Sequence, residues 1–176
     1  AYEANDPRRD ASVRTFYLRP TGNRQDTVRV NYTIKYQDPQ ATAGGGLASG
    51  NGSENGWRVI RYADVLLMYA EALNEQGGGN PLAFEAINQV RRRARGNTQA
   101  LPDLRDLSQS ELRSAIYRER RVELAFEGHR WFDLARTGRT LEVISQTRSI
   151  QQRNLLLPVP QRERDVNRNL SQNMGF

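Results

Sequence analysis

The hydrophobic positions of the chain recur with a helical period through most of its length. Residues 59–76 carry densely spaced apolar side chains and stop at the glycine run of residues 77–79, which is a strong end signal for a helix. Pro81 stands where a second helix can begin, and apolar residues follow at spacings of three and four up to Gly96. The pattern therefore predicts two helices joined by a short turn.

A third helix is predicted to open at Ser108, because Ser108 and Glu111 have the spacing of a capping box. Apolar spacing continues this helix to Phe126. Shorter apolar segments predict two more helices, over residues 130–136 and 140–147. Residues 155–176 contain two closely spaced prolines and many asparagines, so we expect an ordered coil that wraps over the domain.

Residues 1–56 have a different pattern. Short β-like runs occupy residues 13–18 and 28–36, with turn residues between them. Alternation in the second run predicts a half-buried strand with one apolar face, formed by Val28, Val30, Tyr32, Ile34 and Tyr36. Residues 37–56 are rich in Gly, Ala, Ser and Asn, which predicts a mobile surface loop. The fold class is therefore mainly α, with short strands and a long loop in residues 1–56 and a helical domain over residues 57–176.

Composition narrows the class of protein. Hydrophobic residues make up 37% of the chain, and no apolar run approaches the roughly 18–20 residues that cross a bilayer. The formal net charge is +6, but the arginines mostly alternate with Glu and Asp, which argues against nucleic-acid binding. There is no cysteine, and His129 is the only histidine, so thiolate catalysis, disulfides and a multi-histidine metal site are excluded within these residues.

The arginine run of residues 91–95 has two interpretations. It resembles a phosphate-binding patch, or it is the solvated last turn of a helix, where cations favour the negative end of the dipole. No aromatic residues are interleaved with the arginines, and this favours the solvated turn.

Three carboxylates, Glu119, Glu123 and Glu127, follow one another at a spacing of four. On a helix this spacing places them on one face, about 6 Å apart at each step. A pair of carboxylates at such distances can serve a glycosidase, with Glu119 and Glu123 as the candidates. Nearby arginines lower carboxyl pKa values, whereas a general acid needs a raised pKa. We therefore favour a structural ion-pair cluster; its other predicted members are Arg120, Arg130 and Asp133, the last paired with Arg136.

Two aromatic positions are candidates for ligand binding. Trp57 follows the glycine-rich segment and precedes the first helix, so its indole either stacks on a ligand or staples the start of the helix. Tyr36, like Tyr32, belongs either to the strand core or to a binding surface, and alternation alone does not separate the two.

Four stretches, in this order, resemble the C-terminal region of the SusD/RagB family. They are RYADVLLMYAEAL (residues 61–73), INQVR followed by RA (residues 87–91 and 93–94), ERRVELAFEG with RWFDL (residues 119–128 and 130–134), and LPVP, NRNL and the ending QNMGF (residues 157–160, 167–170 and 172–176). Together they extend over about residues 57–176.

The resemblance implies a largely α-helical fold with tetratricopeptide-like helices, and the helix pair before Gly96 looks like one such unit. Members of this family are non-enzymatic surface lipoproteins of Bacteroidota-type bacteria. They cap a SusC-like TonB-dependent transporter at the outer membrane, help it to capture glycans or other large nutrients, and need no cofactor. We therefore expect an oligosaccharide or polysaccharide ligand, and neither catalytic residues nor a metal.

The resemblance also bears on residue roles. The segment of residues 119–128 is a structural signature in the family, which agrees with an ion-pair cluster. Ligand contacts in the family often come from loops and aromatics before the RYAD helix. By this analogy the expected ligand-binding residues are Tyr36, Asn51, Asn55 and Trp57.

In one respect the chain departs from the family. Full-length members are several hundred residues long and begin with a signal peptide and a lipidated cysteine, neither of which is present among these residues. We therefore expect a C-terminal fragment, whose membrane association depends on an N-terminal lipid anchor absent from this chain. The alternative function is a helical scaffold that binds another protein without binding a ligand.

Overall fold

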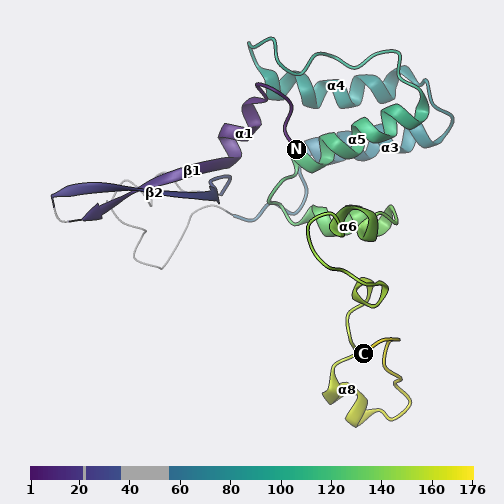
Figure 1. Ribbon diagram of the computed structural model, residues 1–176. Coiled ribbons are helices and arrows are strands. Elements are labelled where there is room, and N and C mark those ends of the chain that lie inside the picture. Colours follow the sequence, from purple (N-terminus) through teal and green to yellow (C-terminus); the bar gives the residue numbers. More distant parts are fainter. Residues whose placement is uncertain (22, 37–55) are drawn as a thin grey trace. The chain divides into compact units, whose positions relative to one another are not determined.

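The computed structural model describes residues 1–21, 23–36 and 56–176, and it divides into two compact units. The first unit is Ala1–Glu127 and the second is Gly128–Phe176. Helices dominate the described residues, and their one sheet has two strands, so the prediction of a mainly α fold is confirmed (Figure 1). The compact units do not divide at residue 57, and the predicted boundary between a loop-rich segment and a helical domain remains a prediction.

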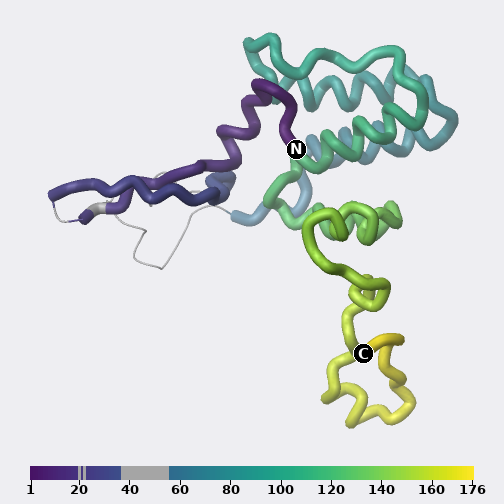
Figure 2. Tube along the Cα trace, in the orientation of Figure 1, coloured from purple at the N-terminus to yellow at the C-terminus, as the bar shows by residue number. Residues whose placement is uncertain are grey.

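Three helices form the centre of the first unit. They are α3 (Tyr62–Glu75), α4 (Pro81–Arg95) and α5 (Gln109–Glu123). The chain path in Figure 2 shows how α4 returns antiparallel to α3 after a short turn, as the sequence predicted. The core between them is made of small and branched side chains: Leu67, Ala70, Ala83, Ala86, Ile87, Val90, Leu112, Ala115 and Ile116. The alanines let the helix backbones approach closely, while the larger side chains fill the space between them.

The ends of these helices follow from local chemistry. The Asn80 side chain accepts a hydrogen bond from the Leu82 amide at 2.9 Å and caps α4, with Pro81 at the first helical position. At the start of α5, the Ser108 hydroxyl accepts from the Glu111 amide, and the Glu111 carboxylate accepts from the Ser108 amide at 2.8 Å. This is the predicted capping box, and it is confirmed.

A pair of amide bonds connects the end of α3 to the start of α5. The Asn74 side chain donates to the Gln109 carbonyl at 2.9 Å, and the Gln109 side chain donates to the Asn74 carbonyl at 2.7 Å. Gly78, in the turn that follows α3, has a φ of +72°, and a Cβ there would lie 2.8 Å from Gln109 Cβ. Glycine is therefore required at this close approach.

The N-terminal part of the first unit is a short helix, α1 (Pro7–Ser12), followed by a hairpin of β1 (Val13–Thr21) and β2 (Arg24–Thr33). The strands pair antiparallel, with an irregularity in register between Arg14 and Phe16. Tyr17 and Tyr32 meet edge to face, with ring centroids 6.1 Å apart. Two strands were predicted here, and both are present.

The predicted half-burial of one face of the second strand is confirmed at Val28 and Tyr32, whose neighbours Thr27, Arg29, Asn31 and Thr33 are exposed, but it is wrong at Val30. Val30 is 47% exposed, and β2 ends at Thr33, so Ile34 and Tyr36 are not part of its face. The physical reason is that an apolar face is buried only when another layer packs on it. No second sheet is found among the described residues.

The second unit consists of short helices and connecting coil. Its helices are α6 (His129–Arg136), α7 (Thr140–Ile144), the 3₁₀ turn η1 (Gln152–Leu155) and α8 (Gln161–Val166). The tail is held by its own hydrogen bonds, in which the Val159 amide donates to the Gln172 side chain at 2.8 Å and Asn173 donates to the Leu157 carbonyl at 2.6 Å. The prediction that the tail is coil throughout is wrong, because α8 forms within it. No helix in the described part of the chain has the length and apolar character to span a membrane.

The capping box gives a test of what fixes the start of α5. Ser108→Ala removes the hydroxyl that accepts from the Glu111 amide, and we expect it to lower the free energy of unfolding by about 1 kcal/mol. Urea unfolding of the intact protein measures this change. Ser114→Ala is the matched control, because Ser114 is an exposed position inside the same helix. There alanine is the better helix former, so an equal loss in both variants contradicts the role of the cap.

Candidate functional site

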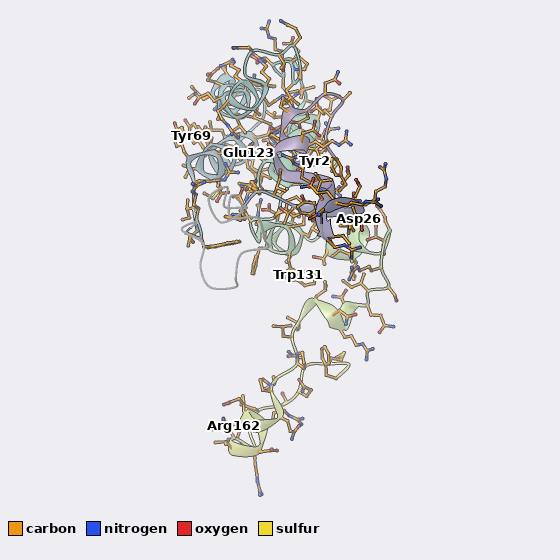
Figure 3. The ribbon with its side chains drawn as sticks, turned by 90° about the vertical axis from the view of Figure 1, so that its left-hand side faces the viewer. Tyr2, Asp26, Tyr69, Glu123, Trp131 and Arg162 are labelled. Carbon is orange, nitrogen blue, oxygen red and sulfur yellow. The ribbon has the colours of Figure 1, made fainter. Side chains whose placement is uncertain are left out.

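A row of three buried carboxylates lies at the C-terminal half of α5 and in the turn that follows it. Glu119, Glu123 and Glu127 are each no more than 5% exposed. We call them the carboxylate ladder, and Figure 3 labels its middle member, Glu123. A buried carboxylate must be paired, because the cost of taking it out of water is several kcal/mol. Its partners therefore decide what the ladder can do.

Glu119 binds arginines from two other helices. One of its oxygens accepts from Arg8 of α1, and the other accepts from Arg91 of α4 at 2.9 Å. Arg8 also forms a bidentate pair with Asp6, at 2.9 and 2.8 Å, and Arg91 binds Glu3 at 2.8 Å. Glu119 thus connects α5 to both α4 and the N-terminal segment.

Glu123 is the most heavily paired of the three. Its side chain accepts from Arg61 at 2.7 Å and from Arg8 at 3.1 Å, and it also pairs with Arg93. These arginines come from α1, from the residue before α3 and from the last turn of α4. One side chain of α5 therefore contacts three separate segments.

Glu127 and the end of α5 are bound by Lys35 and by Arg61, which also binds the Glu123 side chain. Glu127 pairs with Lys35 and accepts from the Arg61 Nε atom at 2.7 Å. Lys35 also donates to the carbonyls of Glu123 and Ala125, at 2.7 and 3.1 Å, and Arg61 donates to the Glu123 carbonyl at 2.6 Å. Cations are favoured at this end of a helix, where carbonyls lack intrahelical partners.

This capping explains one difference from the sequence prediction. Helix α5 was expected to continue to Phe126, but it ends at Glu123, and Phe126 has a φ of +66°. A helix cannot continue through that conformation. The freed carbonyls of Glu123 and Ala125 are the ones that Lys35 binds.

The other members of the predicted ion-pair cluster are Arg120, Arg130 and Asp133. Arg120 is buried and pairs with Asp64 of α3 at 2.8 Å. Arg130 and Asp133 belong to the second unit, where Asp133 pairs with Arg136 at 3.0 Å.

The interpretation of residues 91–95 as a solvated turn is wrong in one respect. Arg91 is only 3% exposed and is bound to Glu119, as described above. Arg92 pairs with Glu85 and Asp103, and Arg95 pairs with Asp103. Arg91, Arg92 and Arg95 thus neutralise carboxylates of their own unit.

The charges around the ladder lower the pKa values of two of its carboxyl groups, those of Glu123 and Glu127. Burial raises the pKa of the Glu123 carboxyl, but the hydrogen bond from Arg61 and the charges of Arg93 and Arg61 outweigh burial, so the pKa lies below its ordinary value. The pKa of Glu127 is lowered in the same way, against burial, by Arg61 and Lys35. Burial lowers the pKa of the Lys35 ammonium by more than Glu127 raises it.

Two of the predicted ligand-binding residues stack on each other. The rings of Tyr36 and Trp57 have centroids 5.1 Å apart and planes inclined by only 18°. Trp57 is 60% exposed, so the stacked pair leaves much of the indole open to solvent. Burial raises the pKa of the Tyr36 hydroxyl, and the Glu127 charge adds to this effect. Asn51 and Asn55 lie outside the described residues.

A cavity of about 230 Å³ adjoins both the ladder and the aromatic pair. Its lining includes Tyr36, Glu123 and Glu127, together with Arg58 and Arg93. The cavity is thus lined by buried ion pairs, by one aromatic ring of the stacked pair and by two exposed guanidinium groups.

Sequence reasoning found the carboxylates but missed their main partners, Arg8, Lys35, Arg61, Arg91 and Arg93. Helical spacing predicts which residues share a face of one helix, but not which residues from other segments meet that face. Arg61 lies 62 residues before its partner Glu123, and Lys35 lies 88 residues before the carbonyl that it binds. The one signal in the sequence is that Lys35 is its only lysine.

The helix pair and the third helix, which carries the carboxylate ladder, form a mainly α-helical fold. The family model described as the SusD family matches residues 5–176, and the chain belongs to that family. The resemblance found in the sequence is therefore confirmed.

Relatives and solved structures agree with this assignment. The chain is 42% identical, over 73% of its length, to SusD-like protein P2 of Formosa agariphila, and it spans 28% of that relative. A crystal structure of a SusD homologue from Bacteroides thetaiotaomicron matches 97% of the chain with a TM-score of 0.76 and 27% identity, over 41% of its own chain. A structure named a laminarin-binding SusD-like protein is 39% identical over 67% of this chain and 23% of its own, with a TM-score of 0.51.

Removing the middle rung of the ladder tests its contribution to stability. We expect Glu123→Gln to lower the free energy of unfolding by about 3–5 kcal/mol, because it leaves Arg8, Arg61 and Arg93 without their shared carboxylate. Glu75→Gln is the matched control, since Glu75 pairs with Arg113 at the surface and such pairs contribute about 0–1 kcal/mol. Equal losses in urea unfolding of the two variants contradict a special role for the ladder.

The ladder also predicts the pH dependence of stability. The pKa values of Glu123 and Glu127 are lower in the folded state than the ordinary value of 4.5. Their contribution is therefore present above that value, and it is lost as the pH falls through the lowered folded pKa values. Protonated Glu123 resembles glutamine, so the stability gap between the wild type and Glu123→Gln should narrow as the pH is lowered from 7 to 3. A gap that stays constant over this range contradicts the prediction.

Proposed function

We propose that this chain is the ligand-binding C-terminal region of an outer-membrane glycan-binding protein. The observation that carries the proposal is the stacked pair of Tyr36 and Trp57, in which the indole is exposed and Tyr36 lines a cavity. Sugar rings pack their C–H faces on such aromatic surfaces. The relative named as laminarin-binding, which is similar over two thirds of this chain, supports a glycan as the ligand.

The proposal includes a partner and a location, both taken from membership of the SusD family. The protein delivers its oligosaccharide or polysaccharide ligand to a SusC-like TonB-dependent transporter. It does so at the surface of the outer membrane, held by an N-terminal lipid anchor that is not part of these residues. Because the chain spans 28% of its relative P2, other parts of the protein contribute to both interactions in this proposal.

The proposed role is binding without catalysis. A glycosidase needs one carboxylic acid with a raised pKa, and Glu123 and Glu127 have lowered ones. Glu119 and Glu123 are also buried and engaged by arginines. These observations favour a structural role for the ladder over the glycosidase hypothesis.

A second candidate function, a helical scaffold for another protein, is favoured by one feature of α3. Its outward face is apolar and exposed, and Figure 3 labels Tyr69 at the edge of this helix. The exposed side chains of the face are Tyr62, Val65, Met68 and Tyr69. Exposed apolar patches of this kind are typical of protein interaction sites.

The aromatic pair is tested by truncating each ring in the intact protein. We expect Trp57→Ala and Tyr36→Ala to weaken glycan binding by about 1–3 kcal/mol each, which is the range for loss of a stacking platform. Laminarin oligosaccharides are the first probe, followed by a panel of other glycans, with affinities measured by calorimetry. Tyr69→Ala is the control, because it removes an exposed tyrosine from α3 and leaves the pair intact.

The outcomes separate the two functions. Loss of glycan affinity in both pair variants, with Tyr69→Ala unchanged, supports the glycan platform. Binding to the transporter with no affinity for any glycan in the panel favours the scaffold and contradicts the proposal.

A further inference from the structure

The cavity beside the aromatic pair is lined by an excess of cations. Within the described residues, its lining includes two carboxylates, Glu123 and Glu127, and five cationic side chains. The five cations are Arg8, Lys35, Arg58, Arg61 and Arg93. They differ in how far their hydrogen-bond donors are already used.

Three of the five cations are committed to the ladder. Arg8 donates to Asp6, Glu119 and Glu123. The atoms of Arg61 donate to the side chains of Glu127 and Glu123 and to a backbone carbonyl, and Lys35 pairs with Glu127 and binds two carbonyls. These side chains line the cavity and have few N–H donors left for a ligand.

Arg58 and Arg93 have donors that the ladder does not use. Arg93 is 61% exposed at its side chain, and its bond to Glu123 comes from one of its terminal nitrogens. Arg58 is exposed, and no hydrogen bond or ion pair joins it to the rest of the described chain. A guanidinium group has five N–H donors in a planar fork, so both side chains can bind an anion at the cavity.

We propose that this cavity receives the anionic group of an acidic glycan, a carboxylate or a sulfate, with Arg58 and Arg93 as its donors and the sugar ring on Trp57. The inference rests on the proposed function, and it narrows the ligand to a substrate class. Arg58 lines the same cavity as Tyr36, the ring on which Trp57 stacks.

The size and electrostatics of the cavity agree with this ligand. Its volume of about 230 Å³ is smaller than the roughly 300 Å³ at which pockets for drug-sized ligands begin, so it suits one sugar unit or its charged group. The carboxylates that face it, Glu123 and Glu127, are 2% exposed at their side chains and are each paired with two or more cations. Their repulsion of an incoming anion is therefore largely neutralised.

The test compares glycans that differ only in charge, with the intact protein. One pair is an oligogalacturonate and the neutral oligosaccharide obtained by reducing its carboxyl groups. The other is a sulfated galactan oligosaccharide and its desulfated form. We expect the acidic member of at least one pair to bind about tenfold more tightly, which is the effect of one charge-assisted hydrogen bond, and to lose this advantage in about 1 M salt.

The variants identify the donors. Arg58→Gln should reduce the preference for the acidic member to about threefold or less, and it should not disturb folding, because Arg58 has no partner in the described chain. Arg121→Gln is the control, since it removes the same charge from an exposed position on α5 outside the cavity lining. Arg93→Gln serves as the second donor variant, with its folding checked because it also loses a bond to Glu123.

Each outcome bears on one proposal. Equal affinity for both members of each pair overturns the inference, as does an acidic preference that survives Arg58→Gln and Arg93→Gln together. The absence of binding by any of the four probes also overturns it. The proposed glycan platform is judged separately, by whether Trp57→Ala weakens binding of any glycan in the panel.

Discussion

The carboxylate ladder of Glu119, Glu123 and Glu127 is the interaction on which the arrangement of the first unit depends. Apolar packing explains how α3, α4 and α5 associate, because their core is continuous and contains alanines at close contacts. It does not explain how α1 and the segment after β2 come to lie against α5. The ladder does, since it binds Arg8 of α1 and Lys35 beyond β2. A buried carboxylate without its cation is strongly unfavourable, so these segments are held together as a set.

The fold was predictable wherever the cause is local. Helix α4 begins at Pro81 and ends before Gly96, and Ser108 caps α5, because these residues act on the backbone next to them. The predictions failed where the cause is distant. The alternation of β2 indicated a strand correctly, yet Val30 is exposed, because burial depends on a layer that the strand's own sequence does not encode. Helix α5 ends early at a turn whose carbonyls Lys35 binds from far away in the chain.

The site shows the same division between near and far causes. A spacing of four was enough to place the three carboxylates on one surface, and the composition was enough to suggest arginine partners. The composition does not show which arginines bind the carboxylates. Arg120, for example, is next to Glu119 in the sequence but binds Asp64 on α3. Tyr36 and Trp57 were each proposed as ligand contacts from their positions in the chain. Their stacking depends on two separate segments meeting in space, which periodicity does not predict.

The ladder and the aromatic pair are connected through the residues beside them. Lys35 precedes Tyr36 in the sequence and is bound to the end of α5. Arg61 is four residues after Trp57 and is bound to Glu123 and Glu127. Both rings are thus carried on backbone that the same buried ion pairs hold. A platform fixed before the ligand arrives loses little conformational entropy on binding, which favours affinity. In the proposed function, the role of the buried carboxylates is therefore to position the two rings, while their own charges remain neutralised by the cations around them.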